Sequence, residues 1–231
     1  LSFLPQDLPS IPCFDFGALL VPAHAIGGDM YDFIPLGKER IGIAIGDVSG
    51  EGVPAALVMA LTYSLLRAEA FRAGSPGDAL RSVNRLLLDI NNMGMFVTLL
   101  YGVLDCISGS FSYARAGHPY PVLLETDSQP VNLPARTGQI IGVLEEPVID
   151  EGSLVLRDGS TLCLYTDGLS EAQIGPEGQQ LEVEGIIQAL AGWPGVGAQD
   201  LCGRLWRMVQ ERGTADQQDD FTVVIVKKRA A

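Results

Sequence analysis

Basic residues are scarce in this chain of 231 residues. It contains 15 Lys and Arg against 28 Asp and Glu, which gives a formal net charge of −13 at pH 7. Nucleic acids and anionic membrane surfaces are bound through a surplus of Lys and Arg, so neither is expected as a partner. Most of the carboxylates are expected to form a solvated surface, although an acidic chain also attracts cations.

Cysteine and histidine are few, and they are not spaced as zinc ligands are. The four cysteines, Cys13, Cys106, Cys163 and Cys202, form no C-x-x-C pair, and no histidine lies near enough to complete a zinc set. They are therefore expected to be buried or free thiols in a reducing compartment, which predicts a cytoplasmic location.

Long uninterrupted apolar segments are also missing. The most apolar helical segment, PAALVMALTYSLLRAEA, contains Arg67 and Glu69, and no basic region followed by an apolar stretch occurs at the N-terminus. The chain is expected neither to span a membrane nor to carry a secretion signal. Because it begins with Leu1 rather than Met, residues 1–12 are interpreted as the end of a linker from an upstream region.

The apolar content, 47 %, is ample for a core. MYDFIPLGKERIGIAIGD predicts a β-hairpin with strands at 30–36 and 40–46 and Gly37 in the turn. A further hairpin is expected to turn at Asp158-Gly159. The other predicted elements are strands at 95–105, 110–125 and 219–228 and helices at 54–74, 75–90, 182–192 and 197–212. Antiparallel hairpins combined with paired helices indicate an α+β fold.

Acidic residues lie at the ends of the first predicted hairpin. Asp29 immediately precedes its first strand, and Asp47 immediately follows its second. Lys38, in the turn, is midway between them, so the two carboxylates are expected to face each other across the open end of the hairpin. Asp32 has the opposite parity from Asp29 and is expected to point to the other face of the sheet. It is therefore left out of the site.

A second acidic pair is predicted near the C-terminus. Asp167 ends a predicted strand, and Asp219 and Asp220 precede the last strand, so antiparallel pairing of these strands would place Asp167 beside Asp219. Converging carboxylates repel one another unless a cation lies between them. These motifs contain no Lys or Arg, and oxygen donors suit Mg²⁺ and Mn²⁺. Each motif alone is more often a turn; four in this order favour a metal site.

Six segments together resemble a known family. IGGDMYDF, IGDVSGEGVPAALVMA, FVTLLYGVLD, ARAGHPYPVLL, LYTDGLSEA and DDFTVVIV are similar to the bacterial SpoIIE/RsbU branch of the PP2C-type (PPM) metal-dependent protein serine/threonine phosphatases. The match runs in order over nearly the whole chain. It implies a single PP2C-like domain at 13–231, built as an α-β-β-α sandwich of two mainly antiparallel sheets flanked by helix pairs. It also implies two Mn²⁺ or Mg²⁺ ions at one edge.

The resemblance assigns roles to individual residues. Asp47 would bridge both metal ions and act in catalysis through metal-bound hydroxide, and the backbone carbonyl of Val48 would ligate one ion. The remaining metal ligands implied are Asp29, Asp167 and Asp219. Residues expected to lie behind the ligands are Asp220, Gly28 and Gly168.

The two histidines fall outside this ligand set. His24, in VPAHAIGGD, is a candidate for a cationic role close to the first acidic motif, and the alternative of a surface or packing histidine is favoured. His118, in AGHPYP, precedes a proline that holds it extended and is interpreted as structural.

The function implied is hydrolysis of phosphoserine or phosphothreonine on a regulatory protein by direct attack of metal-bound hydroxide. The resemblance suggests a STAS-type anti-sigma-factor antagonist as substrate, in bacterial stress or developmental signalling. An upstream sensor or regulatory domain is expected outside this chain, and a homodimer is left open. The alternative is a catalytically silent PP2C-like binding or regulatory module, and metal-stimulated hydrolysis of an aryl phosphate discriminates between the two.

Overall fold

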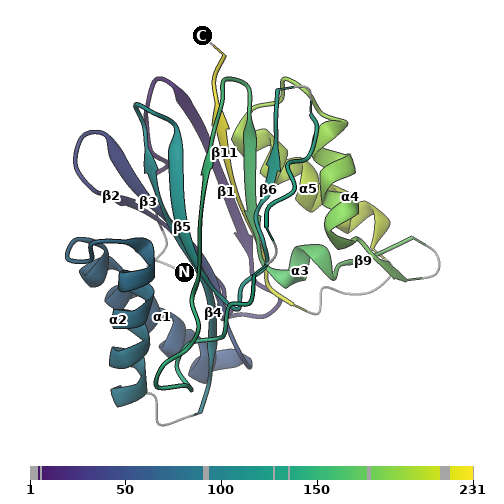
Figure 1. Ribbon diagram of the computed structural model, residues 1–231. Helices are drawn as coiled ribbons and strands as arrows, with labels where there is room; N and C mark the ends of the chain where they lie inside the picture. Colours follow the sequence, from purple (N-terminus) through teal and green to yellow (C-terminus); the bar gives the residue numbers. More distant parts are fainter. Residues whose placement is uncertain are drawn as a thin grey trace. The chain divides into compact units, whose positions relative to one another are not determined.

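The computed structural model describes residues 5, 7–90, 94–126, 128–134, 136–175, 178–213 and 219–230 (Figure 1). Contacts divide the chain into two compact units. The first unit contains His24–His118 and Pro134–Val155, and the second contains Asp7–Ala23, Pro119–Leu133 and Leu156–Ala231. Each unit has an antiparallel sheet with helices packed on it, which confirms the α+β prediction. A linker at 1–12 followed by one domain stays a prediction, and 1–4 and 6 lie outside the described residues.

The first unit has a five-stranded sheet in the order β2-β3-β4-β5-β7. Helices α1 and α2 pack against each other; α1 contacts β2 and β3, and α2 contacts β4, β5 and β7 (Figure 1). The elements of this unit are β2 (Met30–Pro35), β3 (Arg40–Val48), α1 (Gly52–Ala70), α2 (Pro76–Ile90), β4 (Val97–Asp105), β5 (Ser110–Ala116) and β7 (Asp150–Val155).

The first predicted hairpin is confirmed, with one correction. Strands β2 and β3 pair antiparallel with Met30 opposite Gly46, the register predicted from a turn centred on Lys38. Strand β3 continues to Val48, so Asp47 lies inside the strand rather than after it. The extension arises because β4 pairs with these residues as well, with Thr98 opposite Asp47.

Helix α2 shows how local sequence sets a helix boundary. The amide of Asp78 donates to the Ser75 hydroxyl at 3.1 Å, and that hydroxyl donates to the Asp78 carboxylate at 2.8 Å. Ala79, Leu80, Val83 and Leu87 form a buried apolar face, whereas Ile90 at the last position is 45 % exposed. Helix α1 begins at Gly52, keeps Pro54 in its first turn, and ends at Ala70 instead of reaching Gly74.

An ion pair attaches α1 to the sheet. Asp32 is 1 % exposed, and both of its carboxylate oxygens accept hydrogen bonds from Arg67, from Nε at 2.6 Å and from Nη2 at 2.8 Å. The side chain of Asp32 thus faces the helices, as its parity predicts. The positive charge on α1 compensates a carboxylate that burial would otherwise make costly.

Helix α1 is also apolar over most of its length. Among the described helices, it is the one that satisfies criteria of length and hydropathy for crossing a membrane. This is weak evidence, because core helices of soluble proteins satisfy the same criteria. The predictions of a chain that does not span a membrane and of a cytoplasmic location stay predictions.

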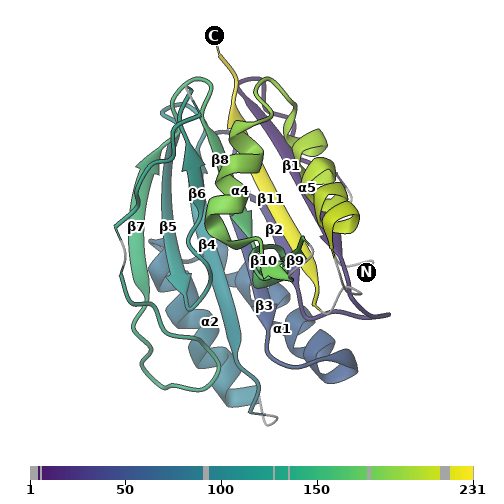
Figure 2. The same ribbon diagram turned by 90° about the vertical axis from the view of Figure 1, so that its right-hand side faces the viewer.

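The second unit has a four-stranded sheet in the order β1-β11-β8-β6 and a small sheet of β9 and β10. Helix α5 packs on β1 and β11, and α4 contacts β6 (Figure 2). The elements of this unit are β1 (Phe14–Val21), β6 (Val122–Leu124), β8 (Thr161–Tyr165), α3 (Asp167–Ser170), β9 (Gln173–Ile174), β10 (Gln179–Gln180), α4 (Glu182–Ala191), α5 (Ala198–Arg212) and β11 (Phe221–Lys228). The helices predicted at 182–192 and 197–212 and the last strand are confirmed.

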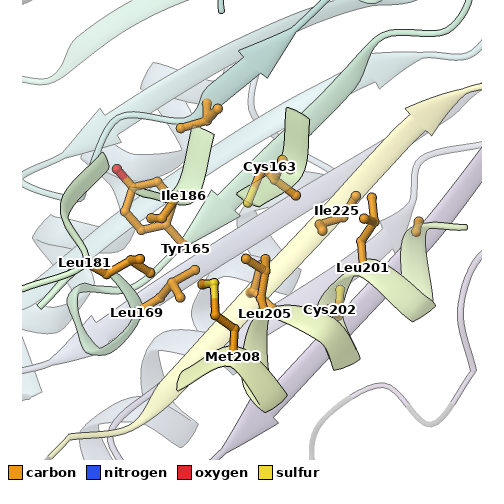
Figure 3. Close-up of a cluster of buried hydrophobic side chains, with 14 of the residues drawn as sticks. Cys163, Tyr165, Leu169, Leu181, Ile186, Leu201, Cys202, Leu205, Met208 and Ile225 are labelled. Carbon is orange, nitrogen blue, oxygen red and sulfur yellow. The ribbon is translucent and has the colours of Figure 1, made fainter. Parts of the chain in front are cut away.

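The core of this unit lies between its helices and the sheet. Leu201, Cys202 and Leu205 from α5 meet Cys163 of β8 and Ile225 of β11 (Figure 3). All four cysteines are described and none is in a disulfide; Cys163 and Cys202 are buried in this core. Burial raises the pKa of the Cys202 thiol to about 12, so this thiol stays protonated at neutral pH. The prediction of buried or free thiols is confirmed.

Two strand predictions are wrong. The hairpin expected at Asp158-Gly159 does not form, because β7 pairs with β5 in one sheet and β8 pairs with β11 and β6 in the other. Every residue of β8 is buried, and both of its edges are already occupied by β11 and β6, so no edge is left for β7. The strand expected at 110–125 is divided between the two sheets, since Gly117 takes a positive φ of +68° after β5.

Strand β1 was not expected from the sequence. Its residues FDFGALLV contain a single β-branched residue, so the pattern typical of strands is weak. Its glycine has a packing role, because a Cβ on Gly17 would lie 2.4 Å from the backbone of Ala198 at the start of α5. Close contact between α5 and β1 therefore requires glycine at this position.

Candidate metal centre

The first acidic pair lies at the open end of the β2–β3 hairpin. Continuing the register of Met30 with Gly46 by one residue sets Asp29 opposite Asp47. Asp29 is 2 % exposed and Asp47 is half-buried. A Cβ on Gly28 would lie 2.8 Å from the carbonyl oxygen of Val48 and 3.5 Å from Oδ1 of Asp47. The backbone at Gly28 thus touches two of the predicted metal-ligating groups.

The turn after β3 is held by a reciprocal pair of hydrogen bonds. The amide of Ser49 donates to the Phe96 carbonyl at 2.9 Å, and the Ser49 hydroxyl accepts from the Phe96 amide at 2.9 Å. Gly50 and Gly52 take positive φ values of +90° and +71°, which turn the chain from β3 into α1. The position of the Val48 carbonyl is therefore fixed by the backbone on both sides of it.

His118 lies beside Thr98 of β4, the strand that pairs with β3. It is 1 % exposed, and its Nδ1 lies 2.9 Å from the hydroxyl of Thr98, which pairs with Asp47 in the ladder. Its carbonyl accepts a hydrogen bond from Arg115 at 2.6 Å. The interpretation of His118 as structural agrees with this burial.

His24 is more than half exposed, and its Nε2 lies 3.7 Å from the carboxylate of Glu51. When protonated, this imidazole therefore has a carboxylate partner at the surface. The cationic role considered for His24 stays a prediction.

The second acidic pair lies where β8 ends and β11 begins. The two strands are antiparallel, with Tyr165 opposite Val223. A Cβ on Gly168 would lie 2.0 Å from the carbonyl oxygen of Asp220 and 3.6 Å from the carbonyl carbon of Asp219. The segment that carries Asp167 thus packs directly on residues 219 and 220, as the sequence predicts. One detail is corrected: β8 ends at Tyr165, and Asp167 begins the short helix α3.

The electrostatics of this pair disfavour an uncompensated negative charge at Asp167. Burial raises the pKa of its carboxyl group, and the negative charge of Glu171 raises it further, against an opposing hydrogen bond from the Gly168 amide at 3.0 Å. Asp220 is buried, and its Oδ1 accepts from the Ala23 amide at 2.9 Å, which orients it toward the backbone. The Asp219 carboxylate is exposed and accepts from the Asp220 amide at 2.8 Å.

The donor chemistry of each pair suits a hard divalent cation. The groups brought together are carboxylates and the Val48 carbonyl, and oxygen donors of this kind are preferred by Mg²⁺ and Mn²⁺. Among the residues that the structure describes, no group of three or more His, Cys, Asp or Glu side chains is placed to hold a metal ion. Each unit therefore provides a pair with fitting donors, and the four-aspartate centre stays a prediction.

Sequence reasoning missed two neighbours of these acids. Glu171 lies four residues after Asp167, a helical spacing for like charges that could have indicated their interaction. Thr98 lies opposite Asp47 only because of the β3–β4 register, for which no local signal exists.

Comparison with known proteins identifies the family. The chain matches the family described as Stage II sporulation protein E (SpoIIE) over residues 37–229. It is 33 % identical over 200 residues to protein IcfG of Synechocystis sp., a match that covers 74 % of this chain and 31 % of IcfG. It is 27 % identical over 229 residues to the phosphoserine phosphatase RsbU of Bacillus subtilis, covering 99 % of this chain and 67 % of RsbU.

A solved structure of the RsbU and RsbW domains of Rv1364c from Mycobacterium tuberculosis matches with a TM-score of 0.81 and 27 % identity. That match covers 100 % of this chain and 64 % of the other, so this chain spans about one third to two thirds of the length of these relatives. The predicted PP2C-like α+β fold is confirmed by this likeness. The chain belongs to the SpoIIE family, in the SpoIIE/RsbU-type branch of the PP2C-like protein phosphatases.

Proposed function

We propose that this chain is a Mn²⁺- or Mg²⁺-dependent protein serine/threonine phosphatase that hydrolyses phosphoserine or phosphothreonine on a regulatory protein. The observation that carries the proposal is the pairing of Asp29 with Asp47 beside the Val48 carbonyl at the end of the β2–β3 hairpin. This arrangement occurs in a chain that is 27 % identical over 99 % of its length to a phosphoserine phosphatase.

The first unit is proposed to provide three of the metal-ligating groups. When bound, two divalent cations would activate a water molecule for in-line attack on phosphorus and offset the charge of the phosphoryl group. Asp47 is proposed as the bridging ligand, the role that the family resemblance implies. Its backbone is held in place because β3 is paired with β2 on one side and with β4 on the other. Asp29 and the Val48 carbonyl are proposed as further ligands from the same unit.

The second unit would provide Asp167 and Asp219. Asp220 and Gly168 are proposed to support them, because Asp220 is tied to the Ala23 amide and Gly168 packs on the 219–220 peptide. Magnesium is supported by a protein of the same fold: RsbX, at TM-score 0.71 and 16 % identity, has been solved in complex with magnesium. The number of ions, two, rests on the family resemblance.

The substrate proposed is a phosphorylated STAS-type anti-sigma-factor antagonist, on the strength of the SpoIIE/RsbU resemblance. A sensor or regulatory region outside this chain is part of the proposal, because the relatives are longer than the part that this chain matches. A homodimer is the oligomeric state to test, and sedimentation of the chain in solution is the measurement that tests it.

Mn²⁺ titration by calorimetry, with p-nitrophenyl phosphate hydrolysis measured in parallel, tests the central residue. Asp47→Asn should abolish turnover and lower Mn²⁺ affinity by more than about 100-fold. This loss is larger than the loss of affinity expected when a residue that only supports a metal ligand is replaced. Asp89→Asn is the matched control, because Asp89 is an exposed residue on α2.

The outcomes separate the two candidate functions. Asp47→Asn with wild-type metal affinity and turnover would contradict the proposed centre. A wild-type chain that binds Mn²⁺ but hydrolyses neither p-nitrophenyl phosphate nor a phosphoserine peptide would favour the catalytically silent binding module.

A further inference from the structure

The first unit contains a pocket that the proposed phosphatase chemistry does not use. It has a volume of about 450 Å³, within the range of small-molecule sites, and lies where β3 begins and β4 ends. Its apolar wall includes Ala70 and Phe71 at the end of α1 and Val103 of β4. The connection between α1 and α2 closes one side of it.

This pocket is separate from the acidic pair on β3. Arg40, which lines it, is the first residue of β3, and Asp47 follows seven residues later, which is about 23 Å along an extended strand. The two side chains also have opposite parity, so they point to opposite faces of the sheet. A molecule bound in the pocket would therefore not contact the acidic pair.

One residue that lines the pocket, Tyr101, has a buried hydroxyl group without a partner among the described residues. Tyr101 is 1 % exposed, and its Oη makes no hydrogen bond to any described residue. A Cβ on Gly42 would lie 3.0 Å from both Oη and Cε2 of Tyr101, so the phenol lies over the space that glycine leaves empty. An unpaired buried hydroxyl is unfavourable, and hydroxyls of this kind are normally satisfied by a ligand or by water.

The pocket also presents a cation. The Arg40 side chain is exposed and forms no ion pair with any described residue. Asp105 lies opposite Arg40 in the β3–β4 ladder, but its Oδ1 already accepts hydrogen bonds from the Ile107 amide at 3.2 Å, the Ser108 amide at 2.8 Å and the Ser108 hydroxyl at 2.7 Å. These bonds use one carboxylate oxygen, and together with the positive charge of Arg40 they lower the pKa of Asp105, so a ligand anion would share the exposed guanidinium group with this carboxylate.

These features define the chemistry of the ligand. A guanidinium fork matches the geometry of a carboxylate or a phosphate. The negative charge of Asp105 at the same end of the pocket disfavours a dianion, so a monocarboxylate suits it better than a phosphate monoester. The apolar wall requires an aromatic or branched aliphatic body on the ligand.

We propose that this pocket binds a small apolar monocarboxylate, with its carboxylate on Arg40, its apolar body against Ala70, Phe71 and Val103, and a hydrogen bond from the Tyr101 hydroxyl. The proposal does not depend on phosphatase activity, because binding itself is the readout.

The probe is 4-fluorophenylacetate, titrated into the full chain without metal and followed by fluorine NMR, with 4-fluorophenylacetamide as its neutral counterpart. Saturable binding is expected with a Kd of about 1 mM or tighter, which is typical for a ligand of this size. Arg40→Gln should weaken binding of the acid by about tenfold or more, and Tyr101→Phe by about threefold or more. Arg85→Gln removes the same charge from an exposed position on α2, where Arg85 contacts Ser82, and should bind like the wild type.

Thermal melting of each variant checks that it is folded. Equal affinity for the acid and the amide, or wild-type affinity in Arg40→Gln, would overturn the proposed recognition. If the fluorine signal does not saturate up to about 10 mM 4-fluorophenylacetate, the pocket holds water only and the proposal is overturned. A formed site for a ligand of this size would bind it more tightly than that.

Discussion

Gly28→Ala probes how closely β2 approaches the proposed metal ligands. The new Cβ would lie 2.8 Å from the Val48 carbonyl oxygen, whereas an ordinary contact is 3.4 Å or longer. The segment before β2 would have to move away from β3 by about 0.6 Å, because the nearest atom, the Val48 carbonyl oxygen, belongs to the backbone and cannot swing aside as the end of a flexible side chain could. Overpacking of this kind costs about 1–3 kcal/mol of folding free energy.

The same displacement should weaken metal binding. If the Val48 carbonyl and Asp47 ligate the ion, moving both should lower Mn²⁺ affinity by about 10–100-fold, as loss of supporting contacts does in other metal sites. Urea unfolding gives the stability change, and calorimetric titration gives the affinity. The matched control is Gly203→Ala in α5, where a Cβ meets no atom within 4 Å and should stabilise the helix by up to about 1 kcal/mol.

Two results would refute the reasoning. Unchanged stability in Gly28→Ala would show that the strands tolerate a methyl group here. Reduced stability with unchanged Mn²⁺ affinity would show that the groups beside Gly28 do not ligate the metal.

Three further predictions concern the ion pair, Tyr101 and Gly168. Arg67→Met should lower the free energy of unfolding in urea by about 2–4 kcal/mol, because it leaves the Asp32 carboxylate buried without its cation. Adding Asp32→Leu should recover more than half of this loss. If the losses from the two substitutions simply add, the two residues are not a coupled pair. Burial raises the pKa of Tyr101 to about 12 from 10.0, so the phenol is neutral in both states below about pH 9, and above that the unfolded state ionises first. Stability should therefore fall by about 1.4 kcal/mol between pH 9 and pH 11, and Tyr101→Phe should remove this part of the loss. Gly168→Ala would place a Cβ 2.0 Å from the Asp220 carbonyl and should lower the melting temperature, whereas a wild-type melting temperature would mean that the 219–220 turn shifts freely.

Local sequence patterns were enough to place the first acidic pair. The β2–β3 hairpin is short, and its turn and its alternation of apolar residues lie within the same segment, so the register that sets Asp29 opposite Asp47 could be read directly. The parity of Asp32 followed from the same alternation. The cap of α2 is equally local, because Ser75 and Asp78 are three residues apart.

Features that join distant segments could not be read in this way. The sequence 150–165 has the pattern of a hairpin, yet β7 and β8 belong to different sheets, because partners for β8 come from residues 122–124 and 221–228. The partner of Asp32 is 35 residues away on α1. Nothing near Asp32 in the sequence indicates it.

The sequence by itself therefore determined the family, the α+β class and the pairing of Asp29 with Asp47, because these depend on short motifs and on alternation within a single hairpin. Only the tertiary structure decided which strands share a sheet, that Arg67 compensates Asp32, and that Tyr101 and Arg40 line one pocket. The physical reason is that strand partners and buried charge pairs are selected by packing between segments far apart in the chain, where many pairings satisfy the same local pattern.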